Sequence, residues 1–251
     1  MPKPTIVLVH GAFAESSSWN GVIQRLQDDG YFVMAAPNPI RGVSSDAQFV
    51  ASVLASIQGP IVLVGHSYGG AVITNAARDN GNVKALVYVA GFAPDEGENI
   101  GELSTRFPGS TLADTVMSVN LADGSKDLYI RQDRYPAQFA ADVPTDVAAL
   151  MGVGQRPLRD VALNEASGPP AWRSIPSWFV IPELDRNIPA AVHRYMAARA
   201  RPREVLEIPG ASHAVGVSCP DEVTGIILRA ARFVEAPLQQ RRPEEQVAPV
   251  Q

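Results

Sequence analysis

The stretch that decides the fold of this chain is Ile61-Val62-Leu63-Val64-Gly65-His66-Ser67-Tyr68-Gly69-Gly70. Its branched apolar residues predict a buried strand, and a helical run starts directly after the turn, at Ala71. Gly-His-Ser-Tyr-Gly is the G-x-S-x-G pattern in the strand–turn–helix setting of a nucleophile elbow, with Ser67 at its tip. The alternative is a glycine-rich turn with an incidental serine. The flanking strand and helix favour Ser67 as a nucleophile.

Composition limits the classes of protein to consider. The 251 residues, 46% of them hydrophobic, suit one large globular domain or a core with an inserted cap. A net charge of −5 gives no basic surface for nucleic acid. No leader resembles a secretion signal, and no apolar run reaches the ~18 residues of a membrane span. The single cysteine, Cys219, suits a reducing compartment, so we expect a cytoplasmic protein.

Strands and helices alternate through the first ninety or so residues. Apolar runs predict strands over 5–9, 31–36 and 83–90 in addition to the one that delivers Ser67. Helical spacing of apolar residues predicts helices from about residue 18 and over 43–57. This alternation indicates an α/β fold with a mostly parallel, doubly wound sheet.

The pattern changes after Gly91. Residues 94–170 hold many Pro, Gly, Asp and Ala and no repeated strand–helix unit, so we interpret them as a helical cap inserted over the sheet. Residues 1–93 and 171–236 then form the α/β core. Its second part has strands over 176–181 and 203–208, a helix over 189–200 and a closing helix from 220. Residues 237–251 are rich in Gln, Arg, Pro and Glu and predict a disordered tail.

A serine nucleophile needs a base within hydrogen-bonding reach and an acid that orients the base. Asp185 follows the predicted penultimate strand and His213 follows the last one. Because the carboxyl ends of parallel strands open at one edge of the sheet, both side chains can meet Ser67. We therefore predict Ser67 as nucleophile, His213 as base and Asp185 as the orienting acid. Glu183 and Asp95 stay open as alternative acids.

A tetrahedral intermediate of acyl transfer needs two N–H donors for its oxyanion. The backbone N–H of Tyr68, directly after the nucleophile, is one candidate. The second donor comes from the loop after the first strand, where Gly11 lets the backbone turn closely. We predict Ala12 as this donor, with Phe13 as the second choice.

The remaining histidines and the cysteine receive structural interpretations. We expect His10 to brace the loop after the first strand, His66 to pack inside the elbow and His193 to lie on the surface of a helix. Cys219 fits a small packed residue. The histidines show no metal-site spacing, so we expect no metal. Six cap residues are candidates for lining a substrate pocket or for packing within the cap: Met117, Leu128, Tyr129, Phe139, Leu150 and Met151.

These motifs resemble the α/β-hydrolase superfamily over residues 4–235. The resemblance lies in Val9-His10-Gly11-Ala12-Phe13 with Trp19, in Gly65–Gly70, in Asp185–Pro189 and in Ser212-His213. They resemble a bacterial carboxylesterase-like branch, which is similar to the plant methylesterase and hydroxynitrile lyase group. The resemblance implies an eight-stranded parent sheet, a helical cap and no cofactor. This sequence departs from the parent because it shows no clear first hairpin.

The same resemblance implies Ser67, Asp185 and His213 as a catalytic triad, with Ala12 and Tyr68 as oxyanion donors. It leads us to expect a serine hydrolase that cleaves a small-molecule carboxylic ester through an acyl-enzyme. A carbon–carbon lyase or a cofactor-free oxygenase on the same scaffold stays open, as does a non-catalytic small-molecule receptor.

One departure bears on the choice between these activities. Hydroxynitrile lyases carry a lysine directly after the catalytic histidine, and this chain has Ala214 there. That difference argues against cyanohydrin chemistry and for hydrolysis. The sequence does not identify the ester, and a homodimer formed through the cap or an edge strand stays open.

Overall fold

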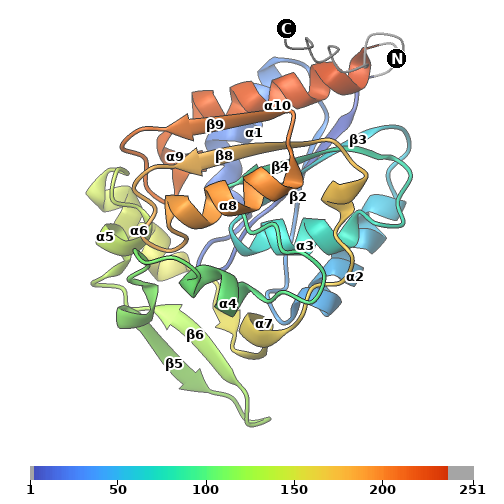
Figure 1. Cartoon of the computed structure of the whole chain (residues 1–251). Coiled ribbons are helices and arrows are strands. Elements are labelled where there is room, and N and C mark those ends of the chain that lie inside the picture. The colour runs from blue at the N-terminus through green and yellow to red at the C-terminus, as the bar shows by residue number, and fades with distance from the viewer. Residues whose placement is uncertain (1–2, 237–251) are drawn as a thin grey trace, which may run out of the picture.

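A parallel sheet of six strands runs through the computed structural model, which describes residues 3–236 (Figure 1). Its strand order is β2-β1-β3-β4-β8-β9, and every neighbouring pair is parallel. All carboxyl ends therefore lie at one edge, where the loops after β3, β8 and β9 meet. The strands are β1 (Thr5–Val9), β2 (Val33–Ala36), β3 (Ile61–His66), β4 (Val83–Val89), β8 (Ser177–Pro182) and β9 (Glu204–Ile208).

Helices cover both faces of this sheet, as the alternation in the sequence predicts. Ile6 and Leu8 of β1 pack into one hydrophobic cluster, and Val7 and Val9 pack into the other. One cluster includes side chains of α1 (Asn20–Asp28), α9 (Val215–Ser218) and α10 (Pro220–Glu235). The other includes side chains of α2 (Val43–Ala55), α3 (Tyr68–Ala76) and α8 (Ala190–Ala200). A short 3₁₀ helix, η1 (Ser16–Trp19), precedes α1.

The second strand is shorter than its apolar run suggests. We predict it from Tyr31, but β2 begins at Val33. The Tyr31 N–H donates to the carbonyl of Leu26, and Gly30 has a φ of 74°. Tyr31 therefore belongs to the turn that ends α1, and its apolar ring conceals this in the sequence.

The segment between β4 and β8 contains helices, as predicted, and also a sheet that the sequence does not predict. The three antiparallel strands β5, β6 and β7 form this second sheet, and the β5–β6 hairpin projects away from the central sheet (Figure 1). Most of β5 is exposed on both faces, so it lacks the alternation that marks a half-buried strand. The elements are α4 (Ile100–Thr105), η2 (Leu112–Asp114), β5 (Val116–Asn120), β6 (Lys126–Ile130), α5 (Tyr135–Phe139), α6 (Thr145–Gly154), β7 (Leu158–Arg159), α7 (Val161–Asn164) and η3 (Ala171–Arg173).

The division into a core and a cap over 94–170 stays a prediction, and the predicted tail, 237–251, lies outside the described residues.

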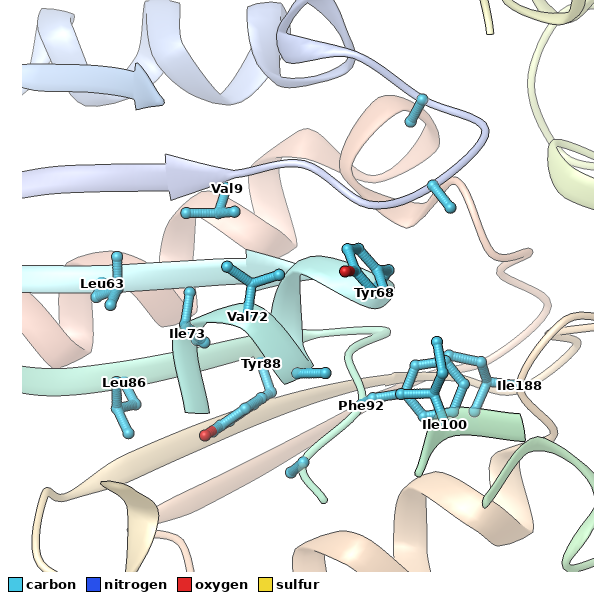
Figure 2. Close-up of a cluster of buried hydrophobic side chains, with 14 of the residues drawn as sticks. Val9, Leu63, Tyr68, Val72, Ile73, Leu86, Tyr88, Phe92, Ile100 and Ile188 are labelled. Carbon is cyan, nitrogen blue, oxygen red and sulfur yellow. The ribbon is translucent and has the colours of Figure 1, made fainter. Parts of the chain in front are cut away.

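A cluster of buried hydrophobic side chains surrounds the elbow (Figure 2). Val72 of α3 and Val9 of β1 belong to it, and Tyr68 stands at the start of the helix, beyond the end of β3. Phe92 and Ile188 belong to the same cluster. This packing fixes the start of α3, the region that holds Ser67.

Candidate active site

Ser67 occupies a strained turn between β3 and α3. Its φ and ψ are 53° and −123°, a conformation that non-glycine residues rarely adopt. A Cβ on Gly69 would lie 2.5 Å from the Val9 carbonyl oxygen, and one on Gly65 would lie 2.6 Å from the carbonyl oxygen of Gly69. The glycines of the motif therefore permit the close contact that the turn requires.

The loop after β1 approaches Ser67 equally closely. A Cβ on Gly11 would lie 2.6 Å from the Ser67 Cβ and 3.2 Å from its Oγ. Only a residue without a side chain fits there unless the backbone moves. The predicted oxyanion loop thus lies directly beside the candidate nucleophile.

The structure brings together the three side chains that the sequence assigns to the triad. His213 Nε2 lies 2.8 Å from Ser67 Oγ, and His213 Nδ1 lies 2.7 Å from Asp185 Oδ2. The three residues come from the loops after β3, β9 and β8, and all are buried. Because a carboxylate only accepts hydrogen bonds, Nδ1 of His213 donates to Asp185. In the neutral ring, Nε2 is then free to accept the Ser67 proton.

Asp185 is held in its ionised form by the groups around it. Its Oδ1 accepts the backbone N–H groups of Asn187 at 2.8 Å and Ile188 at 2.9 Å. Burial by itself would raise the pKa of this carboxyl, but the imidazoles of His213 and His193 outweigh burial and hold that pKa well below its usual range. Asp185 can therefore stabilise a positive charge on His213.

The alternative acids lie in other interactions. Glu183 is exposed, and its Oε2 accepts the backbone N–H of Gly210 at 2.9 Å. Asp95 forms an ion pair with Arg173. His213 contacts Asp185 instead of either of these carboxylates.

The backbone donors of the predicted oxyanion hole differ in availability. Phe13 has a φ of 59°, and its N–H donates to the carbonyl of Arg156 at 2.8 Å. This hydrogen bond occupies the second-choice donor and favours Ala12. Tyr68 is the first residue of α3, and the first N–H groups of a helix have no acceptor inside it. The helix N-terminus also favours negative charge at this position.

His10 and His66 brace the loops, in line with their structural interpretation. His10 Nδ1 lies 2.9 Å from the Gly11 carbonyl, and its Nε2 accepts the N–H of Asn38 at 3.1 Å. His66 Nε2 lies 3.0 Å from the carbonyl of His213. Burial lowers the pKa of His10, and burial together with the nearby His213 lowers the pKa of His66 to about 3. Both rings are therefore neutral near pH 7, so neither adds a positive charge beside His213.

The prediction that His193 lies on the surface is wrong. Its side chain is 1% exposed, and its Nε2 lies 3.1 Å from Asp185 Oδ2. Ala197 and Ala200, four and seven residues further along α8, are also buried. This helical spacing places His193 on the inner face of α8, a signal that the polar neighbours Arg194 and Arg199 obscure.

The side chain of Tyr68 is directed into the core, where its hydroxyl forms a polar contact. Its hydroxyl donates to Asp46 Oδ2 at 2.7 Å, and the backbone N–H groups of Arg41 and Gly42 donate to the same carboxyl. Burial raises the pKa of Asp46 despite these donors, and burial with the adjacent Asp46 raises the pKa of Tyr68. This cluster ties α2 to the first turn of α3.

One of the six cap candidates, Phe139, contacts the triad. The Phe139 ring packs edge-on against His213, with 4.8 Å between ring centroids. Leu150 and Met151 line a groove of about 280 Å³ together with Tyr135, and Met151 also borders a small space next to Phe139. Met117 and Tyr129 line a different hollow on the β5–β6 hairpin, and Leu128 packs against the core cluster.

Residues 3–236 contain no group of three or more His, Cys, Asp or Glu side chains that could hold a metal ion. Within the same range no helix has both the length and the apolar character needed to cross a bilayer.

The sequence model described as "Alpha/beta hydrolase family" matches residues 6–226. Esterase PIR7B of Oryza sativa subsp. japonica is 27% identical over 93% of this chain and 97% of its own length. A pyrethroid hydrolase of Sphingobium wenxiniae is 27% identical over 99% of this chain and 94% of its own.

A solved structure supports the fold. The crystal structure of polyneuridine aldehyde esterase superposes with a TM-score of 0.77 at 18% identity, covering 91% of this chain and 99% of that one. Together these matches confirm the superfamily that the motifs resemble and the α/β fold class predicted from the alternation of elements.

Proposed function

The chain belongs to the alpha/beta hydrolase family, and we propose that it is a serine hydrolase that cleaves small carboxylic esters through an acyl-enzyme intermediate. The observation that carries the proposal is the continuous contact from Ser67 Oγ through His213 to Asp185, at 2.8 and 2.7 Å. The relatives named esterase and pyrethroid hydrolase support hydrolysis of an ester bond.

In the first half-reaction, Ser67 Oγ attacks the acyl carbon while its proton moves to His213 Nε2. Asp185 balances the positive charge that forms on the imidazole. The carbonyl oxygen becomes an oxyanion and accepts hydrogen bonds from the N–H groups of Ala12 and Tyr68. When the tetrahedral intermediate collapses, His213 gives its proton to the leaving alkoxide, and the alcohol departs.

In the second half-reaction, water attacks the acyl carbon of the ester on Ser67. His213 takes one proton from that water, and the same N–H groups stabilise the second oxyanion. Collapse breaks the bond between the acyl carbon and Oγ, and His213 returns its proton to Ser67. The products are the free carboxylic acid and the starting enzyme, so no cofactor enters the balance.

We also propose that residues 94–170 act as a cap that selects the substrate. Ser67 is only 7% exposed and His213 1%, so solvent and substrate have restricted access to them. Leu150 and Met151 of this segment line a groove together with Tyr135 and the polar side chains of Glu15, Ser17 and Asn20.

The test of the proposed function is hydrolysis of p-nitrophenyl acetate and butyrate by the wild type and by Ser67→Ala. We expect Ser67→Ala to lose about 10⁴-fold or more in kcat, because a triad member is removed. Unchanged turnover in a pure preparation of that variant would refute the proposal. Product analysis by chromatography should find a carboxylic acid and an alcohol in equal amounts, whereas a carbon–carbon lyase would release a carbonyl compound.

A further inference from the structure

Two imidazoles converge on one oxygen of Asp185. His213 Nδ1 lies 2.7 Å from Oδ2, and His193 Nε2 lies 3.1 Å from the same atom. The side chains of Asp185 and of both histidines are at most 1% exposed. Since an ionised carboxylate has no proton to give, each nitrogen that faces it carries a hydrogen and donates.

With His193 included, Asp185 accepts four hydrogen bonds. Two come from the backbone N–H groups of Asn187 and Ile188 to Oδ1, and two come from the imidazoles to Oδ2. Without His193, Oδ2 would be held by His213 alone, the group that changes its charge during the proposed reaction. His193 thus supplies a contact to Oδ2 that is present whether His213 is neutral or protonated.

The position of His193 in the fold makes this contact rigid. It lies on α8, which begins five residues after Asp185. The loop between Asp185 and α8 lets the helix place His193 against the carboxylate. Its backbone N–H donates to the Pro189 carbonyl, and its neighbours Val192 and Met196 are fully buried. The ring is therefore anchored by the helix as well as by Asp185.

We infer that His193 is a positioning residue for the reaction. It orients the Asp185 carboxylate, and the negative charge of that carboxylate then serves both His193 and His213. The inference rests on the proposed function, because it assigns His193 a role in the same chemistry. A carboxylate held by two imidazoles keeps the orientation that places His213 Nε2 against Ser67. Because His193 donates to the same oxygen, Oδ2 has less negative charge to offer the imidazolium of His213 during the reaction.

The groups that titrate around this cluster come from three elements besides α8. Asp185 follows β8, His213 follows β9, and His66 ends β3, with its ring centroid 4.9 Å from that of His213. His66 is neutral through the range of the experiment, because burial lowers its pKa to about 3. A shift in the acid limb of the activity profile on changing His193 therefore reports on the Asp185–His213 contact.

The experiment compares His193→Gln with His193→Met in ester hydrolysis. The side chains of Gln and Met have similar size and helix propensity, but only Gln has an amide N–H that can reach Asp185. We expect His193→Met to lower kcat by about tenfold or more relative to the wild type, with KM changed less than about twofold. We expect His193→Gln to keep kcat within about threefold of the wild type. In the Met variant the acid limb of kcat/KM should move to higher pH by about half a unit. Arg194→Ala, one residue along α8 in an exposed ion pair with Glu207, is the matched control and should match the wild type.

Equal activities and equal pH profiles for the Gln and Met variants would overturn the inference. If His193→Met does not fold, the wild type still provides a test. NMR spectra of the wild type labelled with ¹⁵N-histidine report whether Nε2 of His193 carries a hydrogen. A protonated Nε2 on His193 supports the inference, and a bare Nε2 overturns it. Ser67→Ala is assayed in parallel: if it abolishes turnover while the His193 variants behave like the wild type, only this inference fails. If Ser67→Ala retains turnover, the proposed function itself fails.

Discussion

The hydroxyl of Tyr135, on helix α5, donates a 2.7 Å hydrogen bond to the carbonyl of Phe13 in the loop after β1. The same short helix reaches the other loops of the site. The Phe139 carbonyl accepts the N–H of Ala214, next to the candidate base, at 2.9 Å. Gln138 donates to a carbonyl in the loop after β8. A segment of the proposed cap therefore braces the loops after β1, β8 and β9, which hold Ala12, Asp185 and His213.

The first prediction concerns this brace. Tyr135→Phe removes the donor to Phe13 and leaves the ring, so the oxyanion loop loses a contact that holds its positive-φ residue. We expect kcat to fall about tenfold and the free energy of unfolding to fall by about 1 kcal/mol. Steady-state kinetics and urea unfolding measure both. Tyr129→Phe, elsewhere in the cap, is the control; equal effects from the two changes would contradict the role of Tyr135.

The second prediction concerns the close approach of the loop after β1. Gly11→Ala places a methyl group 2.6 Å from the Ser67 Cβ, so the loop or the elbow has to move. A displacement of this kind should cost about 100-fold or more in kcat/KM, because the oxyanion donors leave their positions. Gly81→Ala, where a Cβ meets no atom within 4 Å, is the control in the same assay. A Gly11→Ala enzyme with wild-type kinetics would show that this contact does not matter.

The third prediction separates stability from activity at Asp46. Asp46→Ala leaves the Tyr68 hydroxyl and the N–H of Arg41 without their acceptor in a buried site. We expect a loss of about 2–4 kcal/mol in the free energy of unfolding, and about 1 kcal/mol for Asp46→Asn, which keeps an acceptor oxygen. The activity per folded molecule should change little, since the oxyanion donor of Tyr68 is its backbone N–H. Chemical denaturation with a parallel active-site titration tests this, and equal stability of both variants would contradict it.

The fourth prediction concerns pH. The pKa of His66 is about 3 in the folded protein and about 6.5 when unfolded, so the unfolded chain binds a proton more readily. The resulting stability is complete above about pH 6.5 and is lost as pH falls towards 3. Between about pH 7 and about pH 5, the wild type should lose about 2 kcal/mol more than His66→Gln, whose side chain does not titrate. Urea unfolding at the two pH values measures the difference, and parallel losses in the two proteins would count against the buried neutral imidazole.

Much of this arrangement is predictable because its signals are local in the sequence. The apolar run before Gly65 and the glycines around Ser67 together specify a strand, a turn and a helix, and the loops after later strands must open at the same edge. Asp185 and His213 could therefore be chosen by their place in the chain. Family membership follows from the same motifs.

The parts that sequence reasoning missed depend on contacts between distant segments. Tyr135 and Phe139 look like ordinary apolar residues of the cap, and nothing near them in the sequence indicates that they touch the loops after β1 and β9. His193 did carry a local signal, its helical spacing with Ala197 and Ala200, but its polar neighbours suggested an exposed face. The strand β5 has no buried face, so its sequence lacks the periodicity that would predict it.

The most direct test of the central claim is to trap the acyl-enzyme. The protein is mixed rapidly with p-nitrophenyl butyrate, quenched in acid and digested, and the peptide that contains Ser67 is analysed by mass spectrometry. The account predicts a butyryl group on Ser67 in the wild type and none in Ser67→Ala. A butyryl group on a different residue, or no adduct in the wild type together with full turnover by Ser67→Ala, would contradict it.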